Sequence, residues 1–161
     1  MVTTSPDTLK SFYPISASNE TLDKLGNQAK STVERFNNAL TTYNNTHEGV
    51  DVPLLEIDNT GDIDNKSRDA TLKALASLAK VTPEQLTMTM GGEDGIPPKD
   101  ADTPEEKLAV AAGHIAAADV TRDFIGMNPA YDPNKPRKLG QPSPALVERR
   151  LERAGEILNQ L

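Results

Sequence analysis

The chain has 161 residues, a net charge of −7 and no cysteine, so it holds neither disulfides nor thiolate metal ligands. Ten acidic residues stand against four basic ones in residues 1–65, whereas residues 103–161 hold eight of each. Phosphate backbones repel an acidic chain, and no apolar run is long enough to span a membrane. Composition therefore argues against nucleic acid as a partner and against a membrane span.

Residues 1–18 combine seven serines and threonines with two charged side chains. Such a segment has too little apolar surface to order itself, so we expect a mobile tail before a folded domain at residues 19–161. The segment has no basic and apolar signal-peptide regions, but uncharged, serine-rich leaders occur in some exported bacterial proteins. We expect a cytoplasmic protein, with export without a cleaved signal peptide as an open alternative.

The first helix is predicted from residue 19 to about residue 43. Gly26 should weaken this helix by roughly 1 kcal/mol relative to alanine. Residues 44–65 then hold six acidic and no basic residues together with glycine and proline, which is typical of a surface loop. The helix prediction rests on an apolar stripe formed by Leu22, Leu25, Ala29, Val33, Phe36, Leu40 and Tyr43.

Within that loop, the acidic pattern from Asp58 to Asp64 is similar to a calcium-binding loop, and Asp69 falls at its twelfth position. The match fails at two places. The sixth position requires glycine but holds Ile63, and the twelfth ligand is normally glutamate. We therefore predict an acidic surface turn and no metal site.

A second helix is predicted from about residue 67 to residue 80, and Thr82-Pro83 opens a short helix that Gly91-Gly92 ends. The stretch from Leu75 to Thr87 resembles the helix-turn-helix pattern, with Lys80 in place of the turn glycine. The second helix of that motif would carry no basic residue to meet a phosphate. A helical hairpin of the core is the preferred interpretation, and a DNA-binding regulator is the alternative.

The third main helix is predicted from Pro104 to about residue 125. Between Leu108 and Ala118 its only polar side chain is His114, which indicates a helix in the middle of a bundle. Small residues at positions 109, 113 and 117 would let a neighbouring helix approach closely. His114 has no carboxylate one turn away, so we interpret it as a buried core histidine rather than a general base.

Residues 126–142 contain four prolines and a basic run, which predicts an extended loop able to dock an acidic partner through Lys135, Arg137 and Lys138. Ser143-Pro144 then opens the last main helix, whose charged residues from Glu148 to Glu156, Arg150 included, should form a solvated face. Its apolar seam would either close the bundle, the outcome we favour, or pair with another molecule. That seam consists of Val147, Leu151, Ala154, Leu158 and Leu161.

The sequence thus predicts an all-α, single-domain bundle of four main helices plus one short helix, with long surface loops. It contains no glycine-rich phosphate loop, no paired zinc-ligand spacing and no nucleophile motif. We therefore expect a non-catalytic protein–protein interaction module without cofactor or metal, with an exported bacterial effector or secretion-associated protein as one form of it. The alternatives are a helix-turn-helix-like DNA-binding regulator and an enzyme with an unrecognised site, and the oligomeric state stays open. The expected partner-binding residues are Lys135, Arg137, Lys138, Val147, Leu151 and Leu158.

Overall fold

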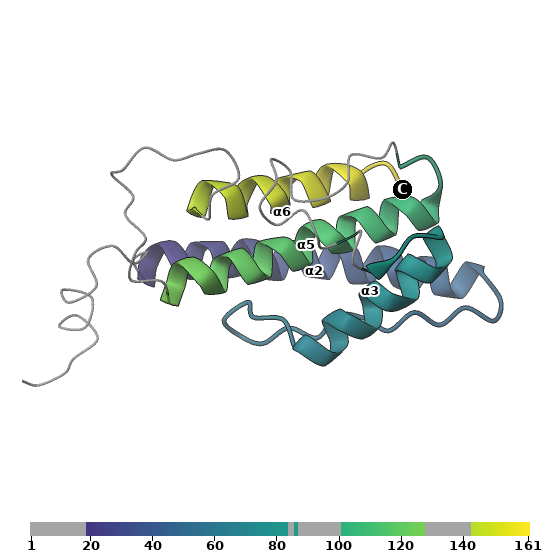
Figure 1. Ribbon diagram of the computed structural model, residues 1–161, viewed down its shortest axis with the longest axis horizontal. Coiled ribbons are helices and arrows are strands. Elements are labelled where there is room, and N and C mark those ends of the chain that lie inside the picture. Colours follow the sequence, from purple (N-terminus) through teal and green to yellow (C-terminus); the bar gives the residue numbers. More distant parts are fainter. Residues whose placement is uncertain (1–18, 84–85, 87–100, 128–142) are drawn as a thin grey trace, which may run out of the picture.

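The computed structural model describes residues 19–83, residue 86, and residues 101–127 and 143–161. The expected N-terminal tail, most of the short helix after Thr82, and Lys135, Arg137 and Lys138 lie outside these ranges. Within them the chain is an all-α bundle without strands, as predicted (Figure 1). No helix of the described part is long and apolar enough to cross a membrane. The four helices are α2 (Asn19–Thr46), α3 (Asn65–Ala79), α5 (Pro104–Met127) and α6 (Pro144–Leu158).

Helix α5 is the central helix of the bundle. It contacts each of the other three helices, and α3 and α6 lie on opposite sides of it (Figure 1). Ala109 and Ala117 are 1% exposed, and Gly113 between them is also buried. These small side chains suit a close approach of the neighbouring helices, which confirms the predicted central position.

The apolar seam of α6 closes the bundle of its own chain as far as Leu158, whereas Leu161, beyond the end of the helix, is 48% exposed. Val147 and Leu151 pack with Leu25 of α2 and Ile125 of α5, and Leu158 belongs to the larger cluster formed by all four helices. The expectation that Val147, Leu151 and Leu158 contact a partner is therefore corrected. Neighbouring helices of the same chain cover these side chains, because the bundle needs this apolar face for its own core.

Two hydroxyl–proline pairs, Thr103-Pro104 and Ser143-Pro144, cap the helices that follow them. Ser143 Oγ accepts a hydrogen bond from the backbone N–H of Leu146 at 3.1 Å, and Thr103 Oγ1 accepts one from Glu106 at 3.1 Å. Helix α3 begins two residues earlier than expected. Its cap is Asp64, whose carboxylate accepts a hydrogen bond from the backbone N–H of Ser67 at 2.9 Å.

The connection between α2 and α3 is held on the bundle by two asparagine side chains of α2. The Asn44 amide exchanges two hydrogen bonds with the backbone of Val52, both of 3.0 Å. Seven residues earlier, the Asn37 amide does the same with Leu55, at 2.9 and 3.0 Å. These amides satisfy backbone groups that have no strand partner, which explains how an extended segment can lie along a helix.

Helix α3 ends at Lys80, which adopts the left-handed conformation with φ 60° and ψ 41°. Since a Cβ atom is unfavourable there, we expect Lys80→Gly to raise the free energy of unfolding by about 0.5–1 kcal/mol. Urea denaturation followed by circular dichroism measures this change. Lys80→Ala keeps the Cβ atom and should show no such gain. A Lys80→Gly protein less stable than Lys80→Ala would contradict the assigned conformation.

Candidate functional site

A tight turn at residues 57–64 carries the first group of charged residues. Ile57 and Ile63 form an isolated antiparallel bridge at its base. At its tip, Asp58 Oδ1 accepts hydrogen bonds from the backbone N–H groups of Thr60 and Asp62, at 2.9 and 3.0 Å, and from the Thr60 hydroxyl at 2.7 Å. These bonds, the Thr60 hydroxyl foremost, lower the pKa of Asp58.

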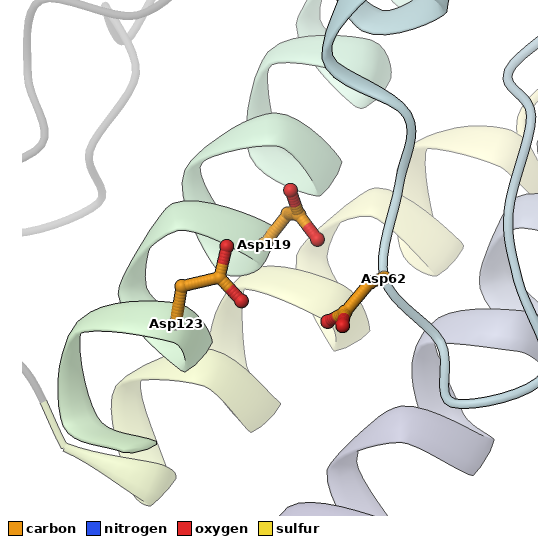
Figure 2. A group of neighbouring side chains, drawn as sticks. All are labelled: Asp62, Asp119 and Asp123. Carbon is orange, nitrogen blue, oxygen red and sulfur yellow. The ribbon is translucent and has the colours of Figure 1, made fainter. Parts of the chain in front are cut away.

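The carboxylates that the sequence aligned with a calcium loop do not converge on one point. Asp58 caps its own turn, Asp64 caps α3, and Asp69 lies 3.7 Å from the Arg68 guanidinium. Asp62 instead faces helix α5. It meets Asp119 and Asp123, which are one helical turn apart (Figure 2), and one carboxylate oxygen of each lies within 4.8 Å of the others.

Two arginines complete this group, which we call the aspartate–arginine cluster: Asp62, Arg68, Asp119, Arg122 and Asp123. Arg122 Nη1 donates to Asp62 Oδ1 at 2.9 Å, and Arg68 Nη1 of α3 donates to Asp119 Oδ2 at 3.2 Å. The backbone N–H of Ile63 donates to the other Asp119 oxygen at 3.2 Å. The cluster therefore joins the 57–64 turn, α3 and α5.

Burial and mutual repulsion change how these carboxyls hold a proton. Burial raises the pKa of Asp119 to about 6, and the charges of Asp123 and Asp62 act in the same direction. The Ile63 N–H and the Arg68 charge oppose the rise. The pKa of Asp123 is also raised, first by burial and then by the charge of Asp62. Asp119 and Asp123 thus bind a proton more tightly than solvated aspartates do.

Oxygen atoms at this spacing are the donors that hard cations prefer. However, two of the three carboxylates already accept hydrogen bonds from guanidinium groups, whose charge repels a cation. In the described part of the chain, we therefore interpret the cluster as a partly buried ion-pair network that attaches a turn to two helices.

A second site is a pocket of about 320 Å³ on α6, which we call the α6 pocket. Helix α5 contributes His114, which is 3% exposed and thus the buried histidine that the sequence predicted. The other lining residues all come from α6: Arg149, Arg150, Glu152, Arg153 and Glu156.

Arg150 is 1% exposed, so the expectation that all charged residues of α6 form a solvated face is wrong for this residue. Its Nη1 donates to Thr121 Oγ1 at 2.7 Å and to the Ala117 carbonyl oxygen at 3.3 Å, both on α5. Position 150 lies three residues after Val147 and four before Ala154, so helical geometry turns it toward the interior. Arg153 remains exposed and forms an ion pair with Glu156 at 3.2 Å.

Of the aspartate–arginine cluster, the sequence pointed only to Asp62, as part of the calcium-like pattern from Asp58 to Asp64. A weak signal was present, because Asp119, Arg122 and Asp123 place three charges directly after the apolar middle of the helix. Their partner Asp62 is 57 positions before Asp119, so only the fold brings them together.

Neither the models of known protein families, nor the curated proteins, nor the solved structures searched contain a match to this chain.

Proposed function

We propose that this protein is a non-catalytic helical protein–protein interaction module whose α6 pocket receives an acidic segment of a partner protein. One observation carries the proposal: three arginines, against two glutamates, line a single pocket on a chain whose net charge is −7. Guanidinium groups form paired, directional hydrogen bonds with carboxylates, which gives such a pocket a preference for aspartate and glutamate side chains.

The arginines differ in the roles that their positions support. Arg150 is fixed by Thr121 and the Ala117 carbonyl, so its guanidinium loses little freedom when a ligand binds. Arg149 and Arg153 are exposed, so each could exchange an existing contact for an incoming carboxylate. The Arg153–Glu156 pair, at 3.2 Å, shows the type of contact that a partner carboxylate would take over.

The acidic surface of the chain favours a protein partner over nucleic acid. A peptide can place a few carboxylates in the pocket, whereas a duplex also brings its phosphates close to the acidic remainder of the chain. Export as a bacterial effector, or a role in a secretion system, is the form of this proposal that the composition of residues 1–18 supports.

The proposal is tested with a fluorescein-labelled peptide of alternating glutamate and glycine, with binding measured by fluorescence anisotropy. We expect the protein to bind this peptide and not its glutamine–glycine counterpart. Arg153→Gln should weaken binding by about tenfold, because one charge-assisted contact is lost. Glu156→Gln should strengthen it, because Arg153 is released from its internal partner.

Lys73→Gln is the matched control. It removes one positive charge from an exposed position on α3, which does not contact α6 in the described part of the chain. Equal losses in Arg153→Gln and Lys73→Gln would contradict recognition at the pocket. Tight binding of random-sequence duplex DNA without binding of the acidic peptide would overturn the proposal in favour of a DNA-binding regulator.

A further inference from the structure

The 57–64 turn is attached to the bundle by charge and by backbone contact. Arg122 Nη2 donates to the Thr60 carbonyl oxygen at 2.6 Å while Nη1 of the same guanidinium holds Asp62. Below the turn, Gly61 and Gly26 of α2 are both buried and pack backbone against backbone. Asp119 is 5% exposed beneath this turn, so lifting the turn would expose its carboxyl to water.

We propose that the aspartate–arginine cluster is a proton-operated latch, which holds the 57–64 turn on α5 more tightly as the pH falls from neutral to mildly acidic. The geometry for such a device is the convergence of Asp62 of the turn with Asp119 and Asp123 of α5, of which only Asp119 is buried (Figure 2). With all three ionised they outnumber the two guanidinium groups, and uptake of one proton balances the charges.

The charged groups around Asp119 come from every element packed against it. Helix α5 contributes Arg122 and Asp123, the turn contributes Asp62, and α3 contributes Arg68. Helix α2 also faces the turn. Gly26 packs against the turn, and the Lys30 ammonium donates a hydrogen bond to the Asn59 carbonyl oxygen at the tip of the turn, at 2.9 Å. The Ile63 N–H and the Arg68 guanidinium lower the affinity of Asp119 for a proton, but burial of its carboxyl and the charges of its two acidic neighbours raise that affinity more.

The direction of the pH dependence follows from the linkage between proton binding by Asp119 and opening of the 57–64 turn. With the turn in place, the pKa of Asp119 is about 6, and with the turn lifted it returns toward the ordinary 3.8. The closed form therefore binds the proton more tightly. Its stability relative to the open form increases as the pH falls through 6, and this gain is lost as the pH rises again. Between about pH 7.5 and about pH 5, the equilibrium constant for opening should decrease by about tenfold.

Hydrogen exchange measured by NMR tests the latch on the full chain. We expect the protection factors of the Ile63 and Asp64 amides, corrected for the intrinsic pH dependence of exchange, to rise by about tenfold from about pH 7.5 to about pH 5. Asp119→Asn keeps an oxygen to accept the Ile63 N–H but cannot titrate, so this rise should disappear. Asp51→Asn, an exposed change in the same connection, should retain it.

A second measurement covers the case in which Asp119→Asn does not fold. The carboxyl carbon of Asp119 in the unmodified protein is titrated by NMR, and we expect a midpoint near 6. A midpoint at or below 4, or equal corrected protection at the two pH values, would overturn the latch. Neither result bears on the α6 pocket, because the two sites share no residue.

Discussion

Replacing Gly26 by alanine is expected to lower the free energy of unfolding by about 3 kcal/mol, whereas in an isolated helix the same change would stabilise by about 1 kcal/mol. A Cβ atom at position 26 would lie 2.1 Å from the Thr60 carbonyl oxygen and 2.8 Å from Arg122 Nη2. Since the first of these atoms belongs to the backbone, the whole turn would have to move. Urea denaturation followed by circular dichroism measures the effect.

The control for Gly26→Ala is Asn27→Ala, an exposed change at the next position of the same helix. It should alter stability by no more than about 0.5 kcal/mol. If Gly26→Ala proves as stable as Asn27→Ala, the close contact between α2 and the turn is wrong.

Deletion of residues 143–161 is expected to abolish cooperative unfolding. Each large apolar side chain of α6 that leaves the core removes about 1.5–3 kcal/mol, and together these losses are comparable to the whole stability of a typical domain, about 5–15 kcal/mol. The deletion also uncovers the alanine-rich face of α5. Differential scanning calorimetry should show no unfolding transition. The buried apolar side chains lost are Leu146, Val147, Leu151, Ala154, Ile157 and Leu158.

A shorter truncation serves as the control for this deletion. Removal of residues 159–161, which follow the end of α6 and are exposed, should leave a cooperative transition. A folded, cooperative remnant after the longer deletion would mean that α6 is not part of the core.

The helices could be predicted because their signals are local. Hydroxyl–proline pairs mark the starts of α5 and α6. The hydroxyl of each pair accepts a hydrogen bond from a backbone N–H three residues later, so the signal and its effect lie within one helical turn. The central position of α5 followed from its lack of a polar face, because a helix that is apolar on all sides needs neighbours on all sides. The predicted ends of α2 and α5 fell short by two or three residues, where side-chain patterns carry less information.

The contacts between distant segments could not be predicted. Gly26 was interpreted as a local weakness of α2, but its lack of a side chain is what lets the 57–64 turn touch the helix. Arg150 was assigned to solvent by its charge, although its position in the helix places it next to Thr121. The aspartates of the cluster meet only in the fold, since local sequence gives Asp62 no relation to Asp119.

The proposed function is tested most directly by mapping where an acidic peptide binds. The isotope-labelled chain is titrated with the glutamate–glycine peptide, and backbone amide shifts are followed by NMR. We predict that the largest shift changes occur at Arg149, Arg153 and Glu156 of α6 and at His114 of α5, which line the pocket. The largest changes at any other part of the chain, or no changes at all, would contradict the proposed recognition surface.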